Sequence, residues 1–125
     1  MFADNDAVAT IAVKNLEASR KFYEGALGLK IAEQQPGVIT YSSGRSRVFV
    51  YESQFAGTNK ATAATWRIGA GEIEEIVQTL KSKGVPFEHY AMPGLTLEGD
   101  IHVGEGMKVA WCKDPDGNIL SLVSG

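Results

Sequence analysis

Apolar residues recur at helical spacing between residues 72 and 84, in the segment EIEEIVQTLKSKG. They fall at i, i+3, i+4 and i+7, which places them on one face of a helix. Glutamates in the first turn complement the positive end of such a helix, lysines in the last turn complement its negative end, and Gly84 is a natural stop. The pattern predicts an amphipathic helix whose apolar face consists of Ile73, Ile76, Val77 and Leu80.

The segment NLEASRKFYEGALG, residues 15–28, has the same design. Asn15 is a natural N-cap, because its side chain can accept a hydrogen bond from a free backbone amide of the first turn. Leu16, Tyr23 and Leu27 fall near one face, and a glycine at position 25 or 28 ends the segment. We therefore expect a second, shorter helix here.

Eight short runs rich in β-branched and aromatic residues predict strands. The turn sequences SSGRS (42–46) and DPDGN (114–118) separate two pairs of these runs, as in hairpins. The glycine-rich stretch 92–106 is the longest irregular segment, and we expect it to be either a mobile flap or a surface loop. The eight runs are residues 7–13, 30–33, 38–42, 47–52, 65–68, 86–90, 107–113 and 118–123.

The predicted elements occur in the order strand, helix, three strands, and this order is then repeated. The repeat divides the 125 residues into two modules, about 1–57 and 58–125. A chain of this length forms one domain, and neither half could bury a whole core alone. We expect a single α+β domain whose two modules pack together, within one chain or between two chains.

Composition agrees with an ordinary globular protein, since 44% of the residues are hydrophobic and 22% are charged. No stretch approaches the roughly 20 apolar residues that cross a bilayer, so no membrane partner is expected. The net charge of −3 comes from interspersed charges, which argues against nucleic-acid binding. The first residues, MFADNDAVAT, lack the features of a secretory signal and Cys112 is the single cysteine, so we expect a cytoplasmic protein.

Three segments resemble the vicinal oxygen chelate superfamily, which includes glyoxalase I, bleomycin-resistance proteins, extradiol dioxygenases and fosfomycin-resistance enzymes. They are VKNLEASRKFYEGALGLKI (13–31), GEIEEIVQTLKSKGVPF (71–87) and, most specifically, AWCKDPDGNILSLV (110–123). The resemblance implies two βαβββ modules whose curved sheets form a cup around a small-molecule site, usually in a homodimer. It does not fix the reaction, because this fold hosts several enzyme classes and also proteins that only bind a drug.

The enzymes of this family hold a divalent metal in the cup through His, Gln and Glu side chains. The resemblance places the four ligands at residue 7 or 8, at Thr65, at Ser121, and among Val48, Val50 and Glu52. At most one of these residues is a strong ligand, whereas a metal site needs several converging donors. We therefore expect neither the usual metal nor another cofactor, and no classical metal-dependent glyoxalase or dioxygenase activity.

Strand alternation directs Arg67 to the same face as Thr65. A buried guanidinium needs a partner, so we expect Arg67 to meet either Glu52 or an anionic group of a ligand.

In a regular hairpin Cys112 shares a face with Ser121, whereas a bulge would put Trp111 there. No base is visible for Cys112, so we expect an inert buried thiol. Four aromatic residues either stack on a planar ligand or belong to the core or an interface: Tyr41, Tyr51, Trp66 and Trp111.

The two histidines are expected on the surface or in loops, and His102 with Asp100 is the pair that would transfer a proton. The sequence identifies no catalytic residue. The predicted ligand-binding residues are Glu52, Thr65, Arg67, Trp111, Cys112 and Ser121.

The leading hypothesis is a homodimeric protein of the glyoxalase/bleomycin-resistance kind that binds a small organic molecule in the cup without a metal. The alternative is an enzyme, either a metal-free or atypical-metal lyase or isomerase of the glyoxalase type, or a dioxygenase-like protein. A third hypothesis is a structural module whose cup is filled by its own side chains.

Overall fold

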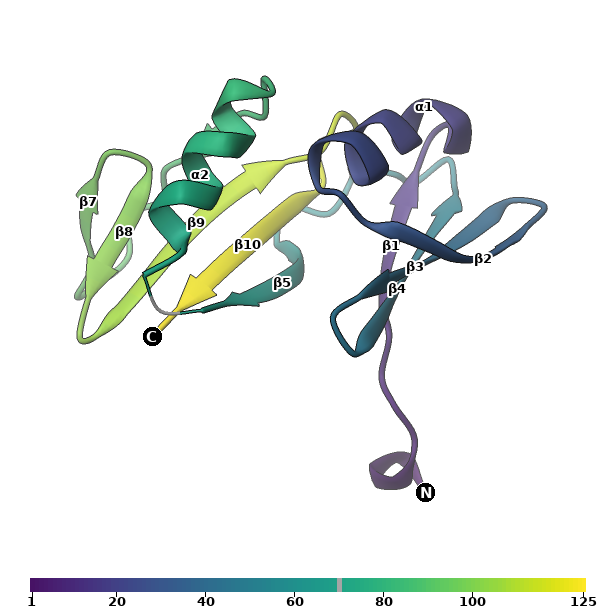
Figure 1. Cartoon of the computed structure of the whole chain (residues 1–125), viewed down its shortest axis with the longest axis horizontal. Coiled ribbons are helices and arrows are strands. Elements are labelled where there is room, and N and C mark those ends of the chain that lie inside the picture. The colour runs from purple at the N-terminus through teal and green to yellow at the C-terminus, as the bar shows by residue number, and fades with distance from the viewer. Residues whose placement is uncertain (70) are drawn as a thin grey trace.

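The computed structural model describes residues 1–69 and 71–125, which form two β-sheets and two main helical segments (Figure 1). The first sheet has the strand order β1 (Ala9–Val13), β4 (Ser46–Glu52), β3 (Val38–Ser43), β2 (Lys30–Gln35). The second has the order β5 (Thr62–Ile68), β10 (Ile119–Ser124), β9 (Met107–Lys113), β8 (Ile101–Gly104), β7 (Thr96–Glu98), and β6 (Phe87–Glu88) also pairs with β9. In each sheet the first strand runs parallel to the last, as the predicted repeat requires.

The helical segments follow the first strand of each sheet. α1 (Leu16–Arg20) continues into a π-helix, η2 (Lys21–Ala26), and α2 spans Ile73–Ser82. A 3₁₀ turn, η1 (Phe2–Asp4), lies at the N-terminus. Within the described residues no helix has the length and apolar character needed to cross a membrane. The α+β class is confirmed, and the predicted helix over 15–28 differs only in its wider second half.

Strand alternation gives each sheet one buried and one more exposed face. In β4, Val48 and Val50 are buried, whereas Phe49 and Tyr51 are exposed. In β5, Thr65 and Arg67 are exposed and alternate with more buried residues. We call the buried face of each sheet its inner face and the opposite one its outer face.

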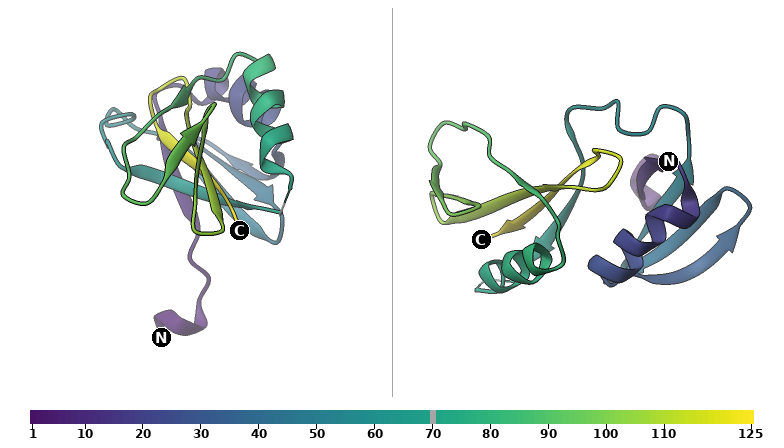
Figure 2. Two further views of the ribbon diagram at one scale, coloured as in Figure 1. Left: turned by 90° about the vertical axis from the view of Figure 1, so that its left-hand side faces the viewer. Right: turned by 90° about the horizontal axis from the view of Figure 1, so that it is seen from above.

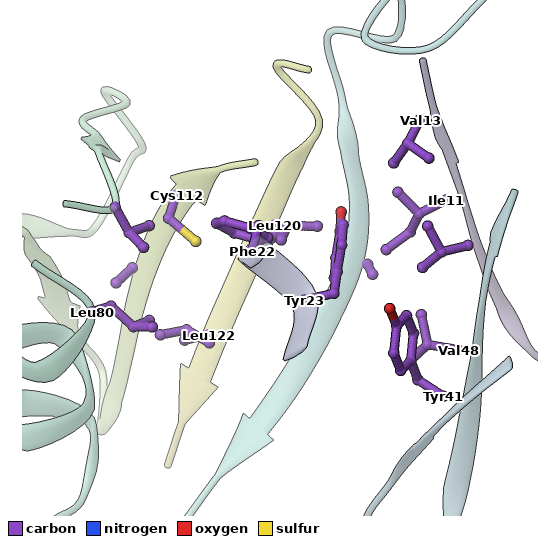
Figure 3. Packing of buried hydrophobic residues seen from close by; sticks show 14 of the residues in the cluster. Ile11, Val13, Phe22, Tyr23, Tyr41, Val48, Leu80, Cys112, Leu120 and Leu122 are labelled. Atoms are coloured by element: carbon purple, nitrogen blue, oxygen red, sulfur yellow. The ribbon is translucent and has the colours of Figure 1, made fainter. Parts of the chain in front are cut away.

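The inner faces of both sheets belong to one shared core (Figure 3). Ile11 and Val48 of the first sheet point toward Tyr23 of η2, and Leu120 and Leu122 of the second sheet belong to the same cluster. Figure 2, seen from above, places α1 and α2 on the same side of β9 and β10. Because the inner faces converge on this core, the two outer faces point away from each other.

The hairpin turn DPDGN joins the two modules. Asn118 Nδ2 donates a hydrogen bond to Ala12 O at 2.7 Å, and Tyr23 OH donates to Asp114 Oδ2 at 2.6 Å. Gly57 in the linker, at φ +73°, lies against the same turn, where an added Cβ would meet the Asp116 carbonyl oxygen. The turn therefore contacts β1, η2 and the linker as well as closing its own hairpin.

The stretch 92–106 was expected to be irregular, and this prediction was wrong. It contains the hairpin of β7 and β8, in which Glu98 pairs with Ile101 across the two-residue turn Gly99-Asp100. Gly99 has φ +66°, a conformation that a tight hairpin turn requires and that glycine adopts without strain.

Candidate functional site

The outer face of the second sheet brings together four of the predicted ligand-binding residues. Thr65 and Ser121 are register partners in the parallel pair β5 and β10, and their hydroxyl oxygens lie 2.6 Å apart. Trp111 is opposite Ser121 in β9, and Arg67 follows Thr65 on the same face of β5. Ser121 is only 4% exposed, whereas Thr65 and Arg67 are open to solvent. The face thus has a polar floor beside an exposed cation.

Glu52 lies elsewhere, so the expected Arg67–Glu52 pair does not form. Glu52 follows Val48 and Val50 on the inner side of β4, and its Oε2 accepts a hydrogen bond from Leu16 N at 2.9 Å. It therefore caps the N-terminus of α1, together with Asn15, whose Oδ1 accepts from Ala18 N at 2.8 Å. Arg67 has no ion pair with any of the residues that the structure describes.

Cys112 also lies on the inner face, opposite Leu120, and the expectation that it faces Ser121 was wrong. The cause is the turn: Asp114 Oδ1 accepts from the backbone amides of Asp116 and Asn118, so strand pairing begins with Lys113 and Ile119. Burial, and then the negative charge of Asp114, raise the pKa of the Cys112 thiol to about 12. The thiol is therefore protonated at neutral pH and unsuited to nucleophilic chemistry.

The outer face of the first sheet presents two aromatic side chains. Phe49 is 37% exposed and Tyr51 is 39% exposed. A hollow of about 220 Å³ beside Phe49 is lined by Glu33, Gln35, Val38 and Thr40. Sequence reasoning did not single out Phe49, although its alternation with Val48 and Val50 is a signal that could have identified it.

The other two aromatic candidates belong to the inner side. Tyr41 is fully buried and donates a hydrogen bond to Glu24 Oε2 at 2.8 Å. Trp66 packs against the shared core, and its Nε1 donates to Ser43 Oγ at 2.9 Å. Of the four aromatic residues, only Trp111 and Tyr51 can face a ligand on an outer face.

His102 is buried on β8, only 3% exposed, which contradicts the expectation of a surface or loop position. Its Nε2 accepts a hydrogen bond from Tyr90 N at 3.1 Å, and its Nδ1 lies 3.3 Å from Val109 O, an acceptor. These contacts indicate a neutral ring that carries its proton on Nδ1. The ring packs edge-on against Trp111, with 4.8 Å between centroids.

The expected pair of His102 and Asp100 is absent from the described structure. Asp100 instead accepts from Lys81 Nζ at 2.6 Å and from His89 Nε2 at 2.7 Å. Lys81 and then His89 hold the pKa of the Asp100 carboxyl below its usual value. Asp100 is therefore an ionised partner of surface cations, and a proton-transfer role with His102 has no geometric support.

A wall stands beside Trp111, formed by the segment between β6 and β7. Tyr90 packs edge-on against Trp111 with 5.2 Å between centroids. Behind it lies a cavity of about 340 Å³, lined by His89, Tyr90, Ala91, Met92, Leu95, Leu97 and His102. This segment shields one side of the polar floor and leaves the β5 side open.

The residues at the expected metal-ligand places do not fit a divalent metal. Thr65 and Ser121 offer neutral hydroxyls that are bonded to each other, and Glu52 is turned to α1. Within residues 1–69 and 71–125, no group of three His, Cys, Asp or Glu side chains converges on one point. Zinc, iron, nickel and manganese sites are built from imidazole, thiolate or carboxylate ligands, which this face does not supply.

Solved structures of other proteins share this fold at low sequence identity. An integron cassette protein from the mobile metagenome of the Halifax Harbour sewage outfall is 22% identical, with a TM-score of 0.70 over 97% of this chain and 98% of its own. A glyoxalase/bleomycin resistance protein/dioxygenase from Alicyclobacillus acidocaldarius is 18% identical, with a TM-score of 0.72 over 97% and 91%. The fosfomycin resistance protein FosX of Listeria monocytogenes, solved with manganese(II) and sulfate, is 14% identical, with a TM-score of 0.73 over 100% and 92%.

No functionally curated protein has a significantly similar sequence. A family model, however, matches residues 6–122, nearly the whole chain. The protein therefore belongs to the Glyoxalase/Bleomycin resistance protein/Dioxygenase superfamily.

Proposed function

We propose that this protein binds a planar organic molecule with an anionic group, on the outer faces of its sheets and without a catalytic metal. The observation that carries the proposal is the 2.6 Å hydrogen bond between Thr65 Oγ1 and Ser121 Oγ. It lies where the family resemblance would place two metal ligands. Two hydroxyls that bond each other give a polar, uncharged floor, which suits a hydrogen-bonding ligand better than a cation.

Arg67 supports the anionic character of the ligand. Its guanidinium is exposed on the same face of β5 as Thr65 and forms no ion pair with the described residues. A guanidinium binds a carboxylate through two parallel hydrogen bonds, and it also stacks on planar groups. The neighbouring Trp111 adds an aromatic surface, so a planar aromatic carboxylate matches this face in both charge and shape.

A second copy of the chain would complete the site. The outer faces of one chain point apart, so Arg67 of the second sheet and Tyr51 of the first cannot enclose one small molecule in that chain. A twofold axis would set the outer face of the first sheet against the partner's second sheet. The half-exposed Phe49 and Tyr51 would then cover the ligand and be shielded from water in the dimer.

Metal analysis of protein purified without chelator tests the first part of the proposal. We expect less than stoichiometric zinc, nickel, iron and manganese, because the donor set does not fit these ions. One tightly held metal ion per chain would contradict the proposal.

Titration with planar aromatic carboxylates, starting with 2-naphthoate, tests the second part. We expect saturable heat of binding and a change in Trp111 fluorescence, and Arg67→Ala is expected to weaken binding by about tenfold because it removes a charge-assisted contact. Arg45→Ala is the matched control, since this exposed arginine lies in the turn between β3 and β4. Equal affinities of the two variants would rule out Arg67 as the anion contact.

A further inference from the structure

A second pair of cavities lies on the inner side of the sheets, away from both outer faces. The larger, about 730 Å³, lies between η2, the residues that follow α2, and the DPDGN turn. The smaller, about 390 Å³, lies between the end of η2, α2 and the inner faces of β5, β9 and β10. Ala26 and Lys83 line both cavities, so the two adjoin. Their volumes are those of small-molecule sites in proteins.

The smaller cavity is lined mainly by apolar side chains. Figure 3 shows how Leu80 of α2 approaches Leu122 of β10, with Cys112 and Leu120 next to them. Its polar lining residues come from the helix: Glu75, Thr79 and Lys83. An aliphatic chain entering this cavity would meet hydrocarbon on the sheet side and a single ammonium group at the mouth.

The larger cavity is positively charged. Lys21, Lys83 and Lys113 line it, and Asp114 is the one acidic residue among the described lining residues. Asp114 is buried, and both its oxygens already accept hydrogen bonds, from Tyr23, Asn118 and backbone amides. This carboxylate therefore has no free capacity to neutralise the lysines.

Lys83 stands at the junction of the two cavities. Its Nζ reaches across to the carbonyl oxygens of Gly25 and Ala26, at 3.3 and 3.5 Å. These contacts are long, and an ammonium group has three donors, so Lys83 can still bind an anion. Neither Lys21 nor Lys83 forms an ion pair with a carboxylate in the described part of the chain.

We propose that these joined cavities bind a medium-chain alkyl carboxylate, with its chain in the smaller cavity and its carboxylate beside Lys83 and Lys21 in the larger one. A neutral hydrocarbon would leave the lysines unused, and a small polar anion would leave the apolar cavity unfilled. The site is distinct from the outer-face site, and it shares no residue with it.

Titration of the full-length protein with decanoate tests this proposal. We expect one saturable site per chain, with a fluorescence change that disappears in Trp66→Phe because Trp66 lines the smaller cavity. The double variant Lys21→Gln/Lys83→Gln is expected to raise the decanoate Kd by about tenfold or more, the size of a lost charge-assisted contact. Decanol, which has the same chain without the charge, is expected to bind wild type about tenfold more weakly.

Blocking the apolar cavity is an independent test. Thr79 lines it from the exposed side of α2, so Thr79→Phe is expected to abolish decanoate binding without disturbing the core. Gln78→Phe, one residue earlier in the same helix, and Lys14→Gln, an equal charge change elsewhere, are the matched controls and are expected to bind as wild type.

Either of two results would overturn the proposal: no saturable binding of decanoate by wild type, or wild-type affinity in both the double lysine variant and Thr79→Phe. The outcome is separable from that of the outer-face site, because the lysine variants are expected to keep wild-type affinity for 2-naphthoate.

Discussion

At the scale of single residues, the most constrained group is the carboxylate of Asp114. It is 4% exposed and accepts hydrogen bonds from Tyr23 OH at 2.6 Å and from Asn118 Nδ2 and N, both at 2.8 Å. A buried carboxylate is tolerated only when its oxygens are satisfied in this way. The turn that identifies the family is therefore also a buried polar network that holds the two modules together.

Removing the Tyr23 hydroxyl tests the strength of this network. We expect Tyr23→Phe to lower the free energy of unfolding by about 1.5–3 kcal/mol, because Asp114 loses a hydrogen bond to a charged group. Tyr51→Phe removes the same atom from an exposed ring and is expected to change stability by less than about 0.5 kcal/mol. Urea denaturation measures both, and similar losses would show that the network contributes little.

The buried thiol of Cys112 makes stability depend on pH in a defined direction. Its pKa is raised from 9.0 to about 12 in the folded state, so above pH 9 the unfolded chain releases a proton that the folded chain keeps. This contribution to stability is full below pH 9 and is lost as pH rises toward 12. We expect wild type to lose about 1 kcal/mol relative to Cys112→Val between about pH 8 and about pH 10. A constant difference would contradict the raised pKa.

Residue positions were predicted correctly where the chain supplies a fixed reference. Thr65 and Ser121 came from spacing to the helix and to the DPDGN turn, and the two prove to be hydrogen-bonded register partners. Glu52 and Cys112 were assigned to the wrong face, because a change of one residue in parity or register turns a side chain from one face to the other. No local signal in the sequence fixes that register.

At the scale of elements, α1 illustrates how a short helix is fixed. It has five residues, too few to be stable alone, so its N-terminal contacts matter. Asn15 caps it from the preceding residue, and Glu52 approaches from β4 to bind Leu16 N. A carboxylate at this end also interacts favourably with the helix dipole.

The capping role of Glu52 can be separated from a ligand-binding role. We expect Asn15→Ala to cost about 1 kcal/mol of stability and Glu52→Gln to cost about 0.3–1 kcal/mol. Thermal unfolding gives these values, with Glu33→Gln on the exposed strand β2 as a neutral control. Glu52→Gln is expected to keep wild-type affinity for 2-naphthoate, and a large loss of that affinity would return Glu52 to the binding site.

The hairpin of β7 and β8 shows which elements sequence patterns miss. Its strands have three and four residues, so periodicity had little to act on. The informative signal was the two-residue turn Gly99-Asp100 between short apolar and β-branched runs. The abundance of glycine in this stretch obscured that signal, whereas α2, with its long apolar period, was located to within two residues.

At the scale of the whole molecule, the shared core decides where a site can form. Both sheets bury their inner faces against α1, η2 and α2, and their outer faces therefore diverge. The repeat of two modules was visible in the sequence, but their relative orientation depends on contacts such as Tyr23 with Asp114, which no local pattern encodes. A site built from both outer faces consequently requires two chains.

Complementation between two defective variants tests this arrangement directly. Arg67→Ala damages the second-sheet half of each proposed site and Tyr51→Ala the first-sheet half, so either homodimer is expected to bind 2-naphthoate poorly. In a mixed dimer, the intact second sheet of the Tyr51→Ala chain meets the intact first sheet of the Arg67→Ala chain, and one complete site forms. Random assortment makes half of the dimers mixed, so co-expression is expected to restore about a quarter of all sites. Calorimetry measures the number of restored sites, and wild-type affinity at those sites distinguishes repair from weak residual binding. A site contained within one chain would show no restoration at all, because every chain would still carry its own defect.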